Sequence, residues 1–253
     1  MIVAVKFFRP YFIGFEWSRF RREVAILGIC KHPHIISFIG ANVPDAKEIE
    51  QSNWQDEGSS LRPFIVSEYL PETLSDVIRT SHRVLPFNVA LRYTYQIATA
   101  LEFLHSMSLV HRDIKPANIV LSADGQKAKL IDFGESRIVS GPREPLTKVG
   151  TPFYEAPEVA KGLYTDRVDS FSFGRMLYEL ATKSLNPTIL ANFRTFYESP
   201  MDTSHLRADC SEEFLELMIS CCHNSPNARP DFEHITRLMG EFCRKFNVQV
   251  QSN

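Results

Sequence analysis

The sequence predicts an α+β fold in which a small sheet-forming part precedes a larger helical part. Up to Leu70 the apolar segments are short and rich in β-branched and aromatic residues, which is typical of strands. After Leu70 the apolar residues recur at helical spacing over longer segments. A chain of 253 residues can form one large domain or two joined lobes around an ample core.

The first part is expected to run strand, helix, strand, strand. The segments "IVAVKFF", "HIISFIGANV" and "FIVSEYL" favour strands. In "WSRFRREVAILGIC" the residues Phe20, Val24 and Leu27 fall on one helical face. We expect the arginines of "SRFRRE" to lie on a solvated face of this helix. The polar stretch "PDAKEIEQSNWQDEGSSLRP" predicts an exposed connection between the last two strands.

The second part is expected to be mainly helical. The segment "FNVALRYTYQIATALEFLHS" carries an apolar stripe through Tyr93, Ile97 and Leu101. The segment "IVLSADGQKAKLI" predicts a hairpin that turns at Asp124–Gly125. Further amphipathic helices are predicted in "VDSFSFGRMLYELAT", in "SEEFLELMISCC" and in the tail "RPDFEHITRLMGEFCRKF".

Composition narrows the class of protein. A net charge of −2 argues against a general attraction to nucleic acid, so we expect no nucleic-acid binding. The five cysteines form no CxxC pair, which favours reduced thiols and a cytoplasmic location. No segment approaches the ~20 apolar residues that would span a bilayer, and the N-terminus lacks the features of a signal peptide. Nothing in the composition predicts an oligomeric state.

Three stretches carry the chemistry: "HRDIKPANIV" from His111, "IDFGES" from Ile131, and "APE" from Ala156. An aspartate with an asparagine five residues later, followed by a hairpin and Asp-Phe-Gly, suits phosphoryl transfer. With these motifs in this order, the chain resembles the eukaryotic protein kinases over nearly its whole length. The resemblance implies one bilobal kinase domain over residues 1–253. Its small lobe would span residues 1–70, from the third strand onward, and its large lobe residues 71–253.

The resemblance implies ATP and Mg²⁺ as cofactors and a protein as the substrate. Asp113 would accept the hydrogen bond and then the proton of the substrate hydroxyl, and Lys115 would reach the γ-phosphate. Asn118 and Asp132 would supply the hard oxygen ligands that Mg²⁺ requires. Gly134 would permit the backbone turn behind Asp132. Phe133 would pack inward and set the direction of the Asp132 side chain.

The short segment "VAVK" matches the strand motif V-A-I-K of the family, so Lys6 would bind the α- and β-phosphates. Glu23 stands at a suitable position in the following helix to be its partner. Taken alone, Lys6 could be a strand lysine with its ammonium in water, and Glu23 could be a surface charge. Together with the downstream motifs, the functional pair is the favoured interpretation.

The same resemblance places the adenine site. Ser67 would occupy the gatekeeper position, and backbone groups of Glu68 and Leu70 would face the adenine edge. Ala4 would pack on one face of the adenine, and Val120 or Leu121 on the other.

Further matches concern the scaffold. Leu27, Phe38, His111 and Phe133 fit the stacked side chains that join the two lobes in active kinases. Asp169 fits the helix aspartate that holds the backbone of the catalytic loop. Glu158 and Arg229 resemble the buried ion pair of the family.

The nature of the acceptor and its regulation are also implied. Lys115, two residues after Asp113, and Thr151 resemble serine/threonine kinases, and other segments resemble the tyrosine kinase-like group. Arg112 before Asp113 would help to bind a phosphate on the activation loop. Within that loop, Thr147 is the first candidate for phosphorylation and Ser140 the second, although either could be a merely exposed hydroxyl.

One part of the family pattern has no counterpart in this sequence. Kinases place two strands joined by G-x-G-x-x-G before the V-A-I-K strand. Only five residues precede Lys6, and Gly14 stands alone after it. We therefore keep two hypotheses: a serine/threonine kinase recorded without its first strands, or a kinase-fold pseudoenzyme or scaffold with little turnover. The presence of Lys6, Asp113, Asn118 and Asp132 favours the enzyme.

Overall fold

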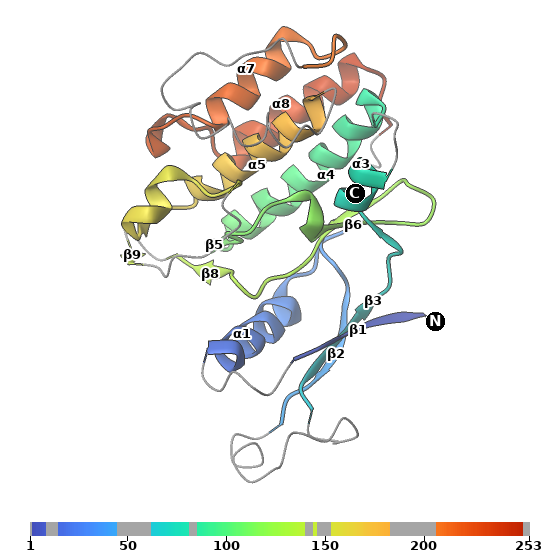
Figure 1. Ribbon diagram of the computed structural model, residues 1–253, viewed down its shortest axis with the longest axis vertical. Helices are drawn as coiled ribbons and strands as arrows, with labels where there is room; N and C mark the ends of the chain where they lie inside the picture. Colours follow the sequence, from blue (N-terminus) through green and yellow to red (C-terminus); the bar gives the residue numbers. More distant parts are fainter. Residues whose placement is uncertain are drawn as a thin grey trace.

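The computed structural model describes residues 2–8, 15–44, 62–80, 85–139, 144–145, 153–182 and 206–249. A small sheet with one helix lies at one end of the molecule, and a larger group of helices lies at the other (Figure 1). This arrangement confirms the predicted α+β fold class.

The small sheet contains β1 (Val3–Phe7), β2 (Phe38–Asn42) and β3 (Phe64–Glu68) in the order β1-β3-β2. Both outer strands are antiparallel to β3, and Lys6 lies opposite Ile65 in this register. Helix α1 (Phe15–Ile29) turns Phe20 and Leu27 into the same apolar core as Ile65. The register therefore places the Lys6 side chain on the face of the sheet that looks toward the core.

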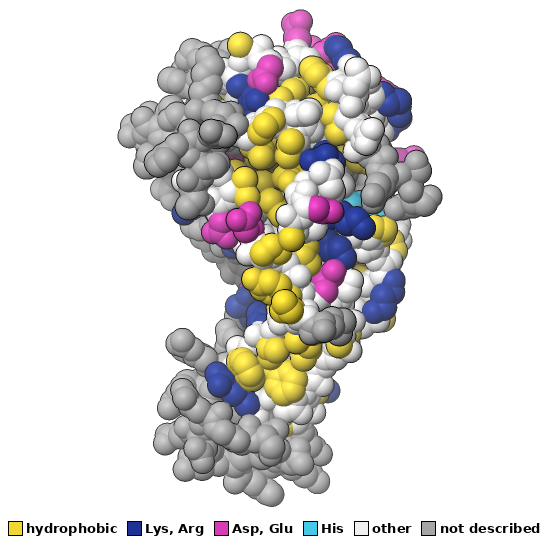
Figure 2. All heavy atoms as spheres, turned by 90° about the vertical axis from the view of Figure 1, so that its right-hand side faces the viewer, with side chains coloured by type: hydrophobic (Ala, Val, Ile, Leu, Met, Phe, Trp, Pro, Cys, Tyr) yellow, Lys and Arg dark blue, Asp and Glu magenta, His cyan; other side chains and the backbone are white. Residues whose placement is uncertain are grey.

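The outer strand β1 leaves several apolar side chains in solvent, including Val5 at 43% and Phe7 at 51% exposure. The view from the side on which the N-terminal end of β1 lies shows hydrophobic side chains gathered over the sheet (Figure 2). The Phe7 ring is partly shielded, because the Arg62 guanidinium lies 4.5 Å from its centre.

A second small sheet joins the two parts of the molecule. It consists of β4 (Glu72–Thr73), β6 (Ile119–Leu121) and β7 (Ala128–Leu130), in the order β4-β6-β7. The β6–β7 hairpin turns as predicted, with Gly125 at φ 63°, a left-handed conformation that glycine adopts easily. The Leu130 amide donates to the His34 carbonyl and its carbonyl accepts from the Ile36 amide, which ties the hairpin to the chain before β2.

The helical part is built around α4 (Phe87–Ser106), α5 (Arg167–Ala181), α7 (Glu212–Cys221) and α8 (Phe232–Lys245), with the shorter α3 (Leu74–Thr80) beside the hairpin. Helices α4 and α8 run side by side (Figure 1). Every residue of α5 from Val168 to Ala181 is buried, so α5 is the central helix. Side chains cap two of these helices: Ser211 accepts from the Phe214 amide and Asp231 from the His234 amide.

Short elements complete the described chain. They are the strands β5 (Leu109–Val110), β8 (Arg137–Ile138), β9 (Glu144–Pro145) and β10 (Leu163–Tyr164), and the 3-10 turns η1 (Pro116–Asn118), η2 (Pro157–Lys161) and η4 (Pro226–Ala228). Strand β5 pairs with β8, which brings the segments before His111 and after Gly134 together. Among the described residues, no helix is both long enough and apolar enough to cross a membrane.

Candidate active site

A cavity of about 290 Å³ lies between the small sheet, α1 and the β6–β7 hairpin. Eight of the residues that the sequence assigned to ATP or metal binding line it: Ala4, Lys6, Glu23, Ser67, Glu68, Leu70, Asn118 and Asp132. Val120 lines it as well, whereas Leu121 does not and instead pairs with Glu72 and Ala128. The structure therefore favours Val120 over Leu121 for contact with a base in this cavity.

The charged end of the cavity is organised around the ammonium of Lys6. Its Nζ donates to both carboxylate oxygens of Glu23, at 2.9 and 2.8 Å, and to Asp132 Oδ1 at 3.0 Å. Glu23 is only 3% exposed, so it is not a surface charge. Strand β1, helix α1 and the segment after β7 thus converge on a single cation.

These contacts set the protonation states. Burial alone would lower the pKa of Lys6, but the carboxylates of Glu23 and Asp132 outweigh it and raise that pKa. Burial would likewise raise the pKa of Asp132, yet the Lys6 ammonium holds it below its usual range. Burial also pushes the pKa of Glu23 upward, but both of its oxygens accept from Lys6, a geometry that requires the ionised form.

A second polar group surrounds Asp113. Lys115 Nζ lies 2.7 Å from Asp113 Oδ2, and Asn118 Nδ2 donates to that same oxygen at 2.8 Å and to the Asp113 carbonyl at 2.7 Å. Because the Asn118 amide nitrogen is used in this way, its oxygen is the atom left for a ligand. Within the described residues that oxygen accepts no hydrogen bond. Asn118 therefore connects the aspartate to the cavity that holds Lys6 and Asp132.

Asp169 of α5 holds the backbone of the loop that carries Asp113. Asp169 is fully buried, and its carboxylate accepts from the backbone amides of His111 and Arg112, both at 2.8 Å. It also contacts His105 Nε2 at 2.9 Å. Burial would raise the pKa of Asp169, but the hydrogen bond from His105 and the other donors hold it below its usual range. These bonds fix the loop that carries Asp113.

Two residues of this region adopt a left-handed backbone that side chains usually avoid: Arg112 at φ 71° and Asp132 at φ 64°. Gly134 lies in a turn after Asp132, as the sequence suggested, but its φ is not in the positive region, so a left-handed backbone is not the reason for glycine at this position. Gly134 provides space instead. A Cβ placed there would lie 3.3 Å from the Arg19 guanidinium and 3.4 Å from Asp132 Oδ1.

His111 and Phe133 pack against each other beneath the site, with ring centres 5.1 Å apart. The Asp113 amide donates to His111 Nδ1 at 3.3 Å, so Nε2 carries the proton and donates to the Ile131 carbonyl at 3.1 Å. Leu27 is also buried, and Phe38 packs partly buried against the same core. Of the four side chains expected to join the two parts, His111 and Phe133 are in direct contact, and the positions of Leu27 and Phe38 relative to them stay a prediction.

Glu158 and Arg229 form the predicted ion pair. The two terminal guanidinium nitrogens of Arg229 donate to the two carboxylate oxygens of Glu158, at 2.5 and 2.8 Å. The Arg229 side chain is 0% exposed and its charge also lies 4.9 Å from the centre of the Phe171 ring.

Several contacts at the site were missed by the sequence analysis. The arginines of "SRFRRE" do not all point to solvent: Arg19 Nη2 lies 2.6 Å from Glu135 Oε1, and Arg22 donates to the Gly134 carbonyl at 3.0 Å. Only Arg21 matches the expected solvated face. Their spacing was a usable signal, because positions 19, 22 and 23 share one helical face with the partner of Lys6.

The contacts of the Glu68 side chain were also not predicted from the sequence, which assigned a role only to its backbone. It accepts from the Ser37 amide at 2.7 Å and pairs with Lys129 of β7. Burial would raise the pKa of Glu68, but the hydrogen bonds from Lys129 and Ser37 lower it. This pair ties the end of β3 to the β6–β7 hairpin.

Three sequence-predicted residues lie outside the described residues. They are Thr151, expected to contact Asp113 and Lys115, and the candidate phosphorylation sites Ser140 and Thr147.

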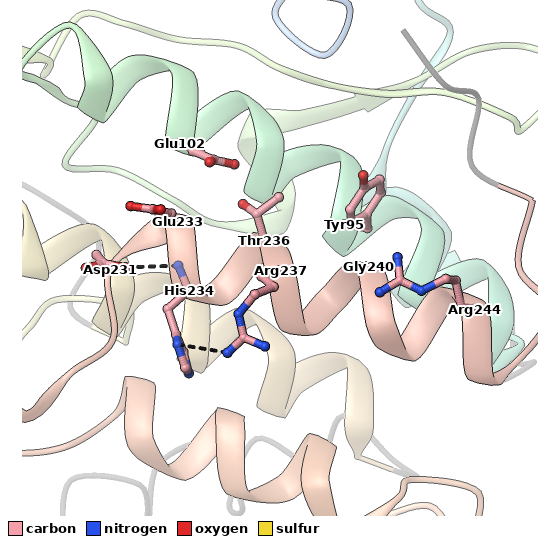
Figure 3. A pocket seen from close by; sticks show the side chains of 9 residues that line it. All are labelled: Tyr95, Glu102, Asp231, Glu233, His234, Thr236, Arg237, Gly240 and Arg244. Atoms are coloured by element: carbon pink, nitrogen blue, oxygen red, sulfur yellow. Dashed lines mark hydrogen bonds between the residues drawn. The ribbon is translucent and has the colours of Figure 1, made fainter.

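A larger hollow of about 590 Å³ lies between α4 and α8 (Figure 3). Glu102 and Glu233 stand toward one end of it, and Tyr95 and Arg244 toward the other. The full lining is Tyr95, Glu102, Asp231, Glu233, His234, Thr236, Arg237, Gly240 and Arg244. None of the predicted site residues is among them, so the smaller cavity is the candidate active site.

The residues of the smaller cavity suit a magnesium–nucleotide complex. Magnesium is usually held by one or two carboxylates together with phosphates and water, rather than by a full protein cage. Asp132 is ionised and the Asn118 oxygen is free to bind, and both line the cavity with Lys6. The other end is lined by the apolar side chains of Ala4, Leu70 and Val120, as the flat face of a base requires.

A part with a sheet and one helix, a helical part and a cavity between them form the architecture of a protein kinase. The family model "Protein kinase domain" matches residues 1–238, and the chain belongs to this family. A protein of Dictyostelium discoideum named "Probable serine/threonine-protein kinase" is 32% identical over 92% of this chain and 14% of its own length. The dual specificity testis-specific protein kinase 2 of Homo sapiens is 30% identical over 91% of this chain and 39% of its own length. The chain thus spans less than half the length of these relatives.

Proposed function

We propose that this chain is a protein serine/threonine kinase that transfers the γ-phosphate of ATP, bound with Mg²⁺, to a hydroxyl of a protein substrate. The observation that carries the proposal is the position of Lys6 between Glu23 and Asp132, in the cavity that Asn118 connects to Asp113. Membership of the kinase family and the names of the relatives support it. The presence of Lys6, Asp113, Asn118 and Asp132 argues against the pseudoenzyme alternative.

The residues divide the work of the reaction. Lys6 would neutralise the α- and β-phosphates, and Asp132 with the Asn118 oxygen would hold Mg²⁺, which supplies charge neutralisation on the phosphates. The substrate oxygen forms a bond to the γ-phosphorus while the bond from that phosphorus to the β-phosphate oxygen breaks, and ADP leaves. Asp113 orients the hydroxyl and takes its proton, and Lys115 offsets charge on the transferred group.

Two further parts of the proposal concern the cellular compartment and the acceptor residue. The five cysteines are free thiols, which supports a reducing compartment such as the cytoplasm. Serine and threonine are the proposed acceptors because Lys115 follows Asp113 at the spacing found in kinases of that type. One relative is named a dual specificity kinase, and phosphoamino-acid analysis of the product distinguishes the two kinds of acceptor.

The test is phosphotransfer from labelled Mg-ATP to a generic protein substrate, followed by phosphoamino-acid analysis. We expect phosphoserine and phosphothreonine from the wild-type chain and at least a ~100-fold lower rate from Asp113→Asn. Equal rates from both purified proteins would show that transfer does not depend on Asp113 and would refute the assignment. Phosphotyrosine as the main product would overturn the acceptor alone.

A further inference from the structure

Two sets of contacts, one helical turn apart on α1, join this helix to the segment that begins at Asp132. In one set Glu23 binds Lys6, which also binds Asp132. One helical turn earlier, Arg19 binds Glu135, three residues after Asp132. The contacts therefore form a closed ring that runs from Asp132 through Lys6 and Glu23, along one turn of α1 to Arg19, and back through Glu135.

The Arg19–Glu135 contact is partly buried, and the backbone on its Glu135 side is held in place. The Glu135 side chain is 11% exposed and that of Arg19 is 27% exposed, so water screens the pair only in part. Arg112 Nε donates to the Glu135 carbonyl at 2.6 Å, which fixes the backbone that carries this carboxylate. Arg22 adds a bond from the same face of α1 to the Gly134 carbonyl at 3.0 Å.

We propose that Glu135 and Arg19 are a positioning pair. Their contact holds α1 in the position in which Glu23 binds Lys6, and Lys6 is thereby placed to bind the nucleotide phosphates. This inference rests on the proposed function and deepens it. Neither residue touches the nucleotide in the proposed arrangement, because neither lines the cavity.

A double-mutant cycle tests the coupling. Glu135→Gln and Arg19→Gln should each weaken Mg-ATP binding by about three- to tenfold, since each removes one charge-assisted hydrogen bond. The double variant should be no weaker than the worse single variant, because both changes break the same contact. Arg19→Lys keeps the charge and should stay within about threefold of wild type. The rate at saturating ATP should fall less than the affinity, because Asp113 and Lys115 are untouched.

Amide hydrogen exchange of α1 without nucleotide gives a second readout that needs no turnover. Both single variants should exchange faster in α1, with unchanged exchange in α4 and α8. Glu241→Gln is the matched control, because it removes a carboxylate from an exposed pair with Arg237 on α8 and should change neither readout. If the wild-type chain transfers no phosphate, the proposed function fails, and α1 exchange still decides the present inference. Wild-type exchange in α1 of Glu135→Gln, or additive losses in the cycle, would overturn it.

Discussion

Lys6 and Asp132 lie 126 residues apart in the sequence, yet 3.0 Å separates the ammonium nitrogen of one from a carboxylate oxygen of the other. With Glu23 on the opposite side, the lysine joins three elements whose relative position decides whether the cavity can hold phosphates. Membership of the protein kinase family gives this cluster its function.

Replacement of Lys6 by methionine should remove the phosphate-binding charge and keep most of the apolar stem. We expect the catalytic efficiency toward ATP to fall by about 100-fold or more, because a preorganised charge at the phosphates is lost. Initial rates over a range of ATP concentrations measure this. Lys245→Met removes an exposed lysine that pairs with Glu213 and should leave the rates unchanged. A Lys6→Met protein within threefold of wild type would contradict the assignment of Lys6.

Arg229→Ala should destabilise the fold without a specific effect on nucleotide binding. It leaves the largely buried Glu158 carboxylate, 11% exposed, without its partner, which costs about 3–5 kcal/mol of the free energy of unfolding. Urea denaturation measures the loss. The matched change in an exposed pair, Arg237→Ala, should cost at most about 1 kcal/mol. Equal losses in the two variants would show that the burial of the Glu158–Arg229 pair has no energetic weight.

Asp169→Asn should slow the chemical step while leaving ATP affinity nearly intact. The amide can no longer accept from both backbone amides and from His105, so the loop that carries Asp113 shifts. A displacement of about 1 Å at a reacting group can cost roughly 100-fold in rate. Steady-state kinetics should show a lower kcat with a KM for ATP within threefold of wild type. Asp166→Asn, at the start of the same helix and 42% exposed, is the control. A raised KM at normal kcat would place the role of Asp169 elsewhere.

His32 should make stability depend on pH in a mildly acidic range. Its ring stacks on Phe103, with centres 5.3 Å apart, and its Nδ1 accepts from the His34 amide at 3.2 Å, which needs the neutral form. Burial, reinforced by the neighbouring His34, lowers the pKa of His32 to about 4. An unfolded histidine titrates near pH ~6.5. Between these values the unfolded chain binds the extra proton, so stability is lost as the pH falls through this window.

The measurement for His32 is the urea midpoint near pH ~7 and near pH ~5 in wild type and in His32→Asn. Asparagine keeps an acceptor near the position of Nδ1 but does not titrate. The midpoint should therefore fall less in the variant than in the wild type over this range. Identical pH dependence of the two proteins would rule out His32 as the source.

Much of the fold could be predicted from local pattern. Helix α4 spans the segment quoted for it, Phe87–Ser106, because its apolar stripe continues over many turns and decides the helical state by itself. The β6–β7 hairpin could be placed because Asp124–Gly125 is a strong turn signal. The site could be predicted because three short motifs resemble those of the protein kinases, and this resemblance implied the roles of Asp113, Asn118 and Asp132.

What could not be predicted depends on contacts between distant segments. A sequence shows that Arg19 and Arg22 are charged, but not that Glu135 and the Gly134 carbonyl lie within reach, so a solvated helix face was the reasonable expectation. The choice between Val120 and Leu121 depends on which face of β6 looks into the cavity. Since neighbouring strand residues point to opposite faces, a shift of one position reverses the answer.

The central claim is that the cavity around Lys6 and Asp132 binds ATP together with Mg²⁺. Calorimetric titration of the protein with ATP tests it most directly. The titration is done once with Mg²⁺ and once with a chelator, for the wild type and for Asp132→Asn. We expect tight binding to require Mg²⁺ in the wild type, and Asp132→Asn to bind ATP weakly with little dependence on the metal. Equal affinity of the wild type with and without Mg²⁺, or an Asp132→Asn protein that behaves as wild type, would contradict the claim.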